Sequence, residues 1–295
     1  MKRAVLASLF AASGILSAQP RISFEAEKSG KPLVCSTVVL DSGLLATVAV
    51  VGAKPDKAHL GADAEGTILD LAVHDPVSRL TLLKVPKGVT VKNAMKRGSS
   101  LDLEPGAPIY LDATKKDAVS RVVSWENRYR ESVLPLALMR VHHPGDQVPA
   151  PGTPLFNGNG ELVAICHQAA PDFGRGTYAL PVEVIERVEK DFKARGRVVR
   201  CWIGIVMEVK HAVPSIMTVR PESPAAVAGV KKADILLAVG EHEVRSYADA
   251  VNAFYYLVSG EKTLVKVLRG TERLEMEVVP EMSPLMRESV GEEKE

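Results

Sequence analysis

The chain has 295 residues, a length that accommodates two domains of ordinary size. Hydrophobic residues make up 46% and charged residues 25% of it, so the chain can bury a core. The formal net charge of +1 creates no field that would attract nucleic acid or an anionic membrane surface. Aromatic residues, at 5%, are too few for a single-stranded nucleic-acid platform. We therefore expect a globular protein without a nucleic-acid partner.

The N-terminus has the layout of a secretory signal peptide. Two basic residues, Lys2 and Arg3, precede an uncharged, mostly apolar stretch over 4–16, and small residues follow up to Ala18. The stretch is short for a membrane span, which needs ~20 apolar residues. We predict a signal peptide over 1–18 and an exported protein, periplasmic or secreted, with no membrane span in the mature chain.

Short β-type segments separated by clusters of turn residues fill the first part of the chain, which favours a barrel or a sandwich. They lie at 33–40, 44–51, 67–73, 80–85, 108–111, 118–125, 134–141 and 162–165. A helix over 182–195 follows, because its apolar residues recur at helical spacing, and Gly196 stands where a C-cap is expected.

The pattern changes after residue 198. Ser223 and Pro224 begin a short predicted helix, and Ser246 is the expected N-cap of a longer one over 247–257. The polar residues 282–295 predict a disordered tail. Strand-like segments surround the helices, at 202–209, 215–219, 233–239, 263–268 and 274–279.

Several of these motifs resemble HtrA/Deg-type serine proteases. The segments 178–182 and 200–205 are similar to the junction of that family, where a trypsin-like barrel ends in "FAIP" and a PDZ domain opens with "RGWLGI". Residues 223–236 resemble the family's "SPAAxAGLxxGDxI". The resemblance implies a mainly β protein, with a trypsin-like double β-barrel over 19–198 followed by an α+β PDZ domain over 199–281.

The nucleophile motif of the family, "GNSGGPL", has a changed counterpart in this chain. Aligned on Pro154 and Leu155, its serine falls on Pro151. The backbone donors of the oxyanion hole would belong to Pro149 and Pro151, and proline has no N–H. The resemblance therefore implies that the nucleophile and both donors are lost.

The other two triad positions also differ from the family. Aligned on "TNNHVV", the base position is Val50, or Ala49 in a register shifted by one. Aligned on "DPxxDLAVLK", the acid position is Arg79, while Asp70 lies in a similar motif too early in the chain. We therefore predict a catalytically degenerate pseudoprotease that is not an enzyme. The alternative is an active serine endopeptidase with misaligned or displaced catalytic residues, and Ser42 has the context nearest to a nucleophile.

The remaining functional motif is the loop that opens the PDZ domain. In such domains a peptide adds a strand to the sheet edge, and backbone N–H groups hold its terminal carboxylate. The resemblance assigns this function to a loop and a helix, with peptides or protein C-termini as partners. The residues are Trp202, Ile203, Gly204, Ile205, Ala248, Val251 and Tyr255. Alternatively, the same residues simply form the core of a small domain. Self-association through the barrel is a further expectation.

The three cysteines, Cys35, Cys166 and Cys201, leave at least one thiol unpaired within the chain. One disulfide among them is an option in an oxidising compartment, and the sequence does not select the pair. No CxxC motif occurs, and we expect neither a metal site nor a cofactor.

Overall fold

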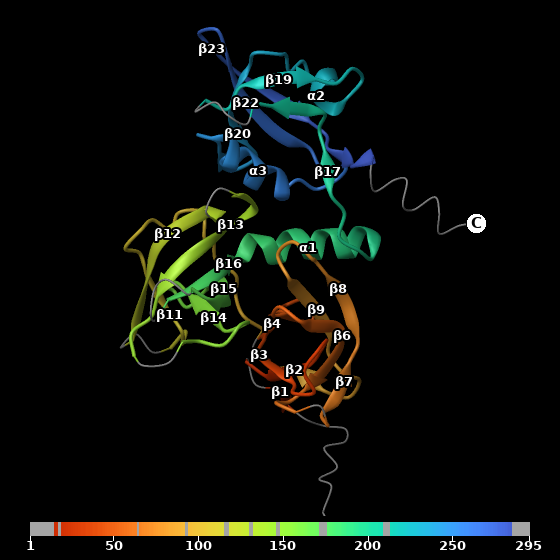
Figure 1. Cartoon of the computed structure of the whole chain (residues 1–295), viewed down its shortest axis with the longest axis vertical. Coiled ribbons are helices and arrows are strands. Elements are labelled where there is room, and N and C mark those ends of the chain that lie inside the picture. Colours follow the sequence, from red (N-terminus) through yellow and green to blue (C-terminus); the bar gives the residue numbers. More distant parts are fainter. Residues whose placement is uncertain are drawn as a thin grey trace, which may run out of the picture.

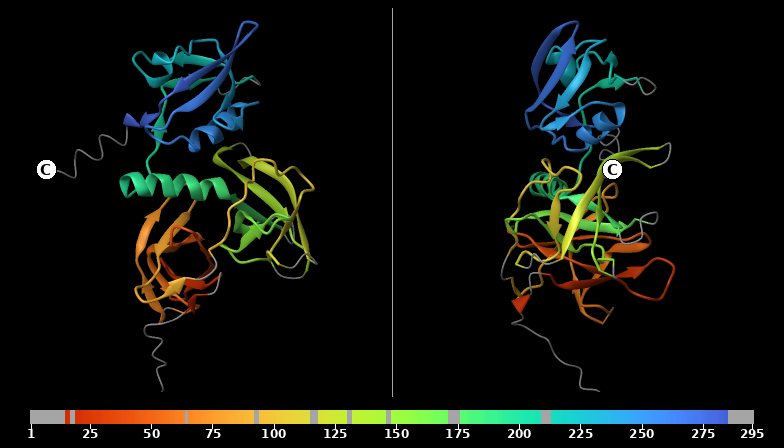
Figure 2. Two further views of the ribbon diagram at one scale, coloured as in Figure 1. Left: turned by 180° about the vertical axis from the view of Figure 1, so that it is seen from behind. Right: turned by 90° about the vertical axis from the view of Figure 1, so that its left-hand side faces the viewer.

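A computed structural model describes residues 15–16, 19–63, 65–91, 94–114, 118–129, 132–145, 148–170, 176–208 and 213–284. Most of the predicted signal peptide, and the predicted tail beyond residue 284, lie outside the described residues. Two β-barrels lie side by side, helix α1 crosses over both, and a C-terminal domain follows beyond α1 (Figures 1 and 2). No helix in the described part of the chain is long and apolar enough to cross a membrane.

The first barrel consists of two four-stranded sheets, ordered β3-β2-β6-β7 and β4-β5-β9-β8. Its strands are β2 (Arg21–Ala26), β3 (Leu33–Ser36), β4 (Val38–Val39), β5 (Leu44–Val48), β6 (Ala53–Leu60), β7 (Thr67–Leu69), β8 (Leu71–His74) and β9 (Leu80–Lys84). A two-residue strand, β1 (Ile15–Leu16), pairs in parallel with β10 (Thr90–Val91).

Strand β9 is apolar along most of its length because it faces two cores. Leu83 packs into the core of the first barrel, together with Phe24 and Leu45. Leu80 and Leu82 point the other way, into a core shared with the second barrel and α1. Residues that alternate along a strand lie on opposite faces, so a continuous apolar run is expected where both faces are covered.

The second barrel is closed, in the order β11-β12-β13-β16-β15-β14. Its strands are β11 (Pro108–Tyr110), β12 (Val119–Tyr129), β13 (Ser132–His142), β14 (Pro154–Phe156), β15 (Leu162–Ala169) and β16 (Gly176–Pro181). Met139, Val141 and Leu155 are fully buried in its interior. Closure leaves no free sheet edge in this barrel.

Helix α1 (Val182–Arg195) confirms the predicted bounds. Val182, Ile185 and Val188 are buried in the core that it shares with both barrels. Gly196 ends the helix with φ 70°, and its N–H donates to the carbonyl of Phe192. The helix therefore clamps the two barrels together before the chain enters the C-terminal domain.

The C-terminal domain contains a four-stranded sheet, β21-β20-β22-β23, and two two-stranded pairs, β17-β24 and β18-β19. Ser223 caps α2 and Ser246 caps α3, as the sequence predicts. The elements are β17 (Cys201–Trp202), β18 (Ile205–Met207), β19 (Ile216–Val219), α2 (Pro224–Val227), β20 (Ile235–Val239), β21 (His242–Glu243), α3 (Tyr247–Tyr255), β22 (Thr263–Arg269), β23 (Glu272–Val278) and β24 (Glu281–Met282).

Helix α3 ends at Tyr255, two residues before the predicted end, because Tyr256 donates its N–H to Ala253 and closes the last turn. Its outer face packs on β13 of the second barrel (Figure 1). There Asn252 accepts a hydrogen bond of 2.7 Å from the backbone N–H of Ala137, and Asn127 donates one of 2.6 Å to Asp249. The C-terminal domain is thus docked on the barrels through polar contacts.

Candidate functional site

The positions predicted for the base and the acid lie side by side in the first barrel. Val50 follows the end of β5, and Arg79 directly precedes β9. These strands pair with Val48 opposite Leu80, and Ala49 donates its N–H to the carbonyl of Arg79 over 3.0 Å. The two ends are therefore neighbours, as the sequence alignment requires.

Pro151, in the loop before β14, is joined to the same region through Ser36. Ser36 donates its N–H to the carbonyl of Pro151 over 2.8 Å, and its own carbonyl accepts a bond of 2.6 Å from Thr47 on β5. The three segments that carry the predicted triad positions thus converge. Their equivalence to a catalytic triad stays a prediction, as does the loss of the donors at Pro149 and Pro151.

Gly152 shows how tightly this loop is packed. Its φ is 81°, and a Cβ at this position would lie 1.8 Å from the carbonyl oxygen of Ser36 and 2.6 Å from the hydroxyl of Thr47. Only glycine allows both the left-handed backbone and this approach. The glycine also donates its N–H to the carbonyl of Cys166, which ties the loop to β15.

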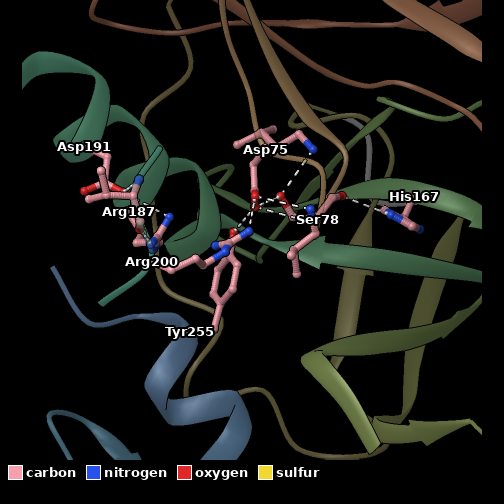
Figure 3. Close-up of polar contacts among 10 residues, drawn as sticks. Asp75, Ser78, His167, Arg187, Asp191, Arg200 and Tyr255 are labelled. Carbon is pink, nitrogen blue, oxygen red and sulfur yellow. Dashed lines mark hydrogen bonds and ion pairs between the residues drawn. The ribbon is translucent and has the colours of Figure 1, made fainter. Parts of the chain in front are cut away.

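The guanidinium of Arg79 lies on His167 of β15, a contact between the two barrels that no sequence pattern predicts. Nη2 of Arg79 is 3.0 Å from Nδ1 of His167 and donates to Gln168 over 2.5 Å. Burial, reinforced by the charge of Arg79, lowers the pKa of His167 to about 3, so this imidazole is neutral. Nε2 of His167 also lies 3.1 Å from the carbonyl oxygen of Ser78 (Figure 3).

Ser42, which has the context nearest to a nucleophile, and two further serines of the barrels, Ser100 and Ser120, lie apart from these positions. Ser42 donates to the buried Glu189, and Ser100 donates to Glu183 over 2.6 Å. Ser120 contacts His143 over 2.9 Å, but both side chains are fully buried. Of the serines named so far, Ser36 alone touches the Pro151 segment, and the sequence analysis did not select it.

A buried polar cluster joins the first barrel to the C-terminal domain. Asp75 is fully buried and accepts hydrogen bonds of 2.6 Å from Ser78 and from Tyr255 of α3, and it pairs with Arg200 (Figure 3). Burial alone would raise the pKa of Asp75, but the charge of Arg200 and the hydrogen bonds of Ser78 and Tyr255 lower it below its ordinary value. Arg187 lies 4.9 Å from the centre of the Tyr255 ring.

The loop over 202–205 has the properties of a carboxylate-binding loop. Gly204 has φ 85°, and a Cβ there would lie 2.1 Å from the Cβ of Ser223. Ile203 and Gly204 are both buried, and among the described residues their N–H groups donate to no acceptor. Buried N–H groups without an acceptor are rare in folded proteins, because each costs about as much as a lost hydrogen bond. They are therefore available to a ligand.

Strand β18 leads away from this loop and presents an edge to which a peptide strand can add. In the described part of the chain β18 pairs with β19 alone, and Val206 in its middle is 38% exposed. Ile205 packs against the domain core from an intermediate position. The geometry is that of an open two-stranded ribbon beside two free N–H groups.

The three residues proposed on α3 occupy different environments. Val251 is half-buried, whereas Ala248 is fully buried and Tyr255 bonds to Asp75 in the interdomain cluster. Tyr247 and Phe254, which the sequence analysis did not select, are also half-buried against the domain core. Residues 247, 251 and 254 follow the i, i+4, i+7 spacing, so they share one face of α3.

A cleft of ≈ 1030 Å³ lies between the second barrel and the C-terminal domain. The ring of His242 stacks on Tyr256 at its wall, with 4.1 Å between the ring centres. A lining this acidic disfavours a peptide carboxylate, which leaves the loop over 202–205 as the better place for one. The acidic lining residues are Asp102, Glu104, Glu183, Glu186, Glu241, Glu243 and Asp249.

The cysteines form no disulfide in the structure, where all three are free. Burial raises the pKa of Cys166 to about 12 and that of Cys35 to about 11, so neither thiol is poised as a nucleophile. Within the described residues no group of three or more metal-ligating side chains comes together.

The fold is that of a trypsin-like double barrel followed by a PDZ domain. Residues 201–279 match the family model of the PDZ domain. Two solved structures of the HtrA-type protease AlgW, one with a tripeptide and one with a decapeptide, superpose with TM-scores of 0.57 and 0.54. They cover 90% of this chain and 94% and 96% of theirs, at 19% and 18% identity, which supports the fold alone.

The chain is similar in sequence to curated serine endoproteases described as DegP-like and DegS. The chain is 27% identical over 254 residues to a probable periplasmic serine endoprotease DegP-like of Pseudomonas fluorescens, a match covering 75% of this chain and 52% of the relative. It is 28% identical over 142 residues to the serine endoprotease DegS of Haemophilus influenzae, covering 45% of this chain and 42% of DegS. The chain thus spans about half the length of the relatives it matches.

These relatives contradict the prediction that the chain is not an enzyme. They are named serine endoproteases, and this similarity points to a protease. The prediction rested on the aligned triad positions 50, 79 and 151 and on the missing N–H donors of Pro149 and Pro151. The structure brings the segments of the three triad positions together without showing what the whole protein does. That prediction is therefore wrong as a statement about the class of protein.

Proposed function

We propose that this protein binds peptides or protein C-termini through the loop over 202–205 and the edge of β18. The observation that carries the proposal is the pair of buried N–H groups at Ile203 and Gly204, which have no acceptor among the described residues. A carboxylate can accept from both, and such charge-assisted bonds are about twice as strong as neutral ones. A peptide strand then extends along β18, where it meets the exposed Val206. The α3 face of Tyr247, Val251 and Phe254 is the proposed second wall of the groove.

The test is calorimetric titration of the chain from residue 19 onward with a library of peptides that end in a free carboxylate. Each binding peptide is then titrated with its C-terminus amidated. We expect amidation to weaken binding at least ~10-fold, because it removes the charge that the two N–H groups hold. Equal binding of both forms, or no binding at millimolar concentration, would refute the proposal.

A matched pair of variants locates the groove. Val251→Asp places a charge on the α3 face that includes Tyr247 and Phe254, and we expect it to weaken binding at least ~10-fold. Val227→Asp is the control, because Val227 is 82% exposed at the end of α2. Loss of binding in the control alone would place the peptide elsewhere.

A second candidate function is serine endopeptidase activity outside the cytoplasm, and the names of the relatives favour it. The predicted signal peptide agrees with an exported, periplasmic protein. Proline has no nucleophilic side-chain atom, so a nucleophile must come from a residue other than Pro151. Ser36 is the serine to examine first, because its backbone N–H bonds to Pro151 and its hydroxyl accepts from Thr153 over 3.2 Å.

Labelling with a fluorophosphonate probe, followed by peptide mapping, tests this second function directly. A serine peptidase takes up one label per chain, and the labelled peptide identifies the nucleophile. Ser→Ala at the mapped position must abolish both labelling and cleavage of an unfolded protein substrate. Absence of label and of cleavage at any pH between about 5 and 9 would leave peptide binding as the only activity. Light scattering of the same sample tests the expected self-association.

A further inference from the structure

Among the described residues, the guanidinium of Arg79, at the junction of the two barrels, has no carboxylate partner. Among the ion pairs of the described residues, none includes Arg79. Its side chain is half-buried, and burial lowers its pKa. A cation removed from water is normally paired with an anion.

The hydrogen bonds of Arg79 leave part of the guanidinium unused. Both hydrogens of Nη2 have acceptors, Nδ1 of His167 at 3.0 Å and the amide oxygen of Gln168 at 2.5 Å, and Nε points at the His167 ring at 3.3 Å. Nη1 makes no hydrogen bond with a described residue and is not among the fully buried side-chain atoms that lack a partner, so solvent reaches it. Two N–H donors on a charged group are therefore open to a ligand.

The backbone of Arg79 indicates that this orientation is imposed by the fold. Its φ is 57°, in the left-handed region that side chains other than glycine and asparagine rarely adopt. Pairing of Leu80 with Val48 and the bond from Ala49 to the carbonyl of Arg79 hold this conformation. Strained residues held by the surrounding structure occur often where a ligand is bound.

We propose that Arg79 forms a binding site for a carboxylate at the junction of the two barrels. The local charge selects a monoanion. The neighbouring His167 is neutral, since its pKa is lowered to about 3, so Arg79 supplies a single positive charge. A carboxylate matches this single charge, whereas a phosphate group carries a charge of about −1.5 to −2 at pH 7. The site is separate from the loop over 202–205 and does not depend on peptide binding there.

The probe is N-acetylalanine, a single residue with a free carboxylate, and its amide is the matched control. The measurement is the Hε1 and Cε1 resonance of His167 in the chain from residue 19 onward at pH 7, assigned with His167→Gln. We expect a saturable shift with N-acetylalanine in the millimolar range and no shift with the amide. The His167 resonance reports on the contact between the two barrels. Binding of the carboxylate to the loop over 202–205 therefore does not change the measured shift.

Two variants complete the experiment. Arg79→Gln should weaken the response at least ~10-fold, because the guanidinium charge is removed. Arg121→Gln, a change at an exposed arginine of β12, should respond as the wild type does. The resonances of the buried His143 show whether each variant is folded.

Three outcomes with N-acetylalanine would overturn the proposal, and a fourth concerns phosphate. They are an unchanged His167 resonance up to ~100 mM N-acetylalanine, an equal shift with the amide, and an undiminished shift in folded Arg79→Gln. Inorganic phosphate is titrated in parallel. Binding of phosphate ~10-fold tighter than N-acetylalanine would assign the site to phosphate and reject the carboxylate.

Discussion

The hydroxyl of Tyr255, on α3 of the PDZ domain, donates a hydrogen bond of 2.6 Å to the buried carboxylate of Asp75 in the first barrel. Asp75 lies four residues before Arg79, and its side chain also bonds to Ser78, whose carbonyl contacts His167. Asp75 and Ser78 therefore connect the end of α3 to His167, which lies at the contact between the two barrels (Figure 3).

Tyr255→Phe should destabilise the docking of the PDZ domain on the barrels. It removes one hydrogen bond to a buried charge and leaves the ring in place, so we expect a loss of about 1.5–3 kcal/mol in unfolding free energy. Urea denaturation followed by fluorescence measures this loss. Tyr247→Phe is the control, because the hydroxyl of Tyr247 has no partner among the described residues. Equal stabilities of both variants and the wild type would contradict the prediction.

Asp75 should make the unfolding free energy depend on pH below 3.8, the ordinary pKa of an aspartate side chain. Its folded pKa lies below the usual value of 3.8, so the charged form contributes stability that is present above 3.8 and lost as the pH falls through the folded pKa. Asp75→Asn should therefore be less stable than the wild type at pH 6, with a gap that narrows toward pH 3. Urea midpoints at the two pH values test this, and a constant gap would show that the Asp75 carboxylate is not stabilised in the fold.

Sequence patterns predicted the elements that depend on local spacing and could not predict those that depend on distant contacts. The helix over 182–195 and the caps at Gly196, Ser223 and Ser246 follow from neighbouring residues, and the structure contains them. Strand β6 was missed, since its sequence AKPDKAHL is polar, includes a proline and lacks alternation. Pairing with β2 on one side and β7 on the other makes it a strand.

The same limit applies to the candidate sites. The resemblance to HtrA/Deg-type proteases assigned peptide binding to the loop over 202–205, because the motif that carries the resemblance lies in consecutive residues. The contact of Arg79 with His167 joins residues 88 positions apart, and that of Tyr255 with Asp75 spans 180 positions. Neither has a local signature in a single sequence. For that reason Tyr255 was assigned to the peptide groove, whereas its hydroxyl bonds to the first barrel.

His143 should make the protein less stable in mild acid. It is fully buried between Ser120 and Thr177, at 2.9 and 2.8 Å, and burial lowers its pKa from 6.5 to about 4. The unfolded chain binds a proton that the folded chain excludes between these values, so stability falls as the pH drops from 6.5 toward 4, by about 1.4 kcal/mol for each unit.

The comparison of wild type with His143→Gln isolates this effect. The variant should be less stable at pH 7, because it loses the hydrogen bonds of the His143 ring with Ser120 and Thr177. Its unfolding free energy should decline less steeply toward pH 4.5. His142→Gln, at the exposed neighbouring position, removes only the smaller cause of the lowered His143 pKa, the charge of His142, so most of the wild-type decline should remain. Parallel pH profiles for wild type and His143→Gln would assign the acid sensitivity to other groups.

Gly204→Ala should abolish peptide binding by the PDZ domain. The new methyl group would lie 2.1 Å from the Cβ of Ser223, so the loop must move, and the N–H groups of Ile203 and Gly204 then lose their common direction. Gly229→Ala is a matched control, because Gly229 has a φ of 90° and no atom within 4 Å of the added Cβ. Both variants suffer left-handed strain of about 1–2 kcal/mol, but only Gly204→Ala displaces the loop. We expect calorimetry to show a peptide affinity at least ~10-fold weaker in Gly204→Ala and unchanged in Gly229→Ala. Equal loss in both would attribute the effect to general destabilisation, and retained binding in a folded Gly204→Ala would place the carboxylate away from the loop.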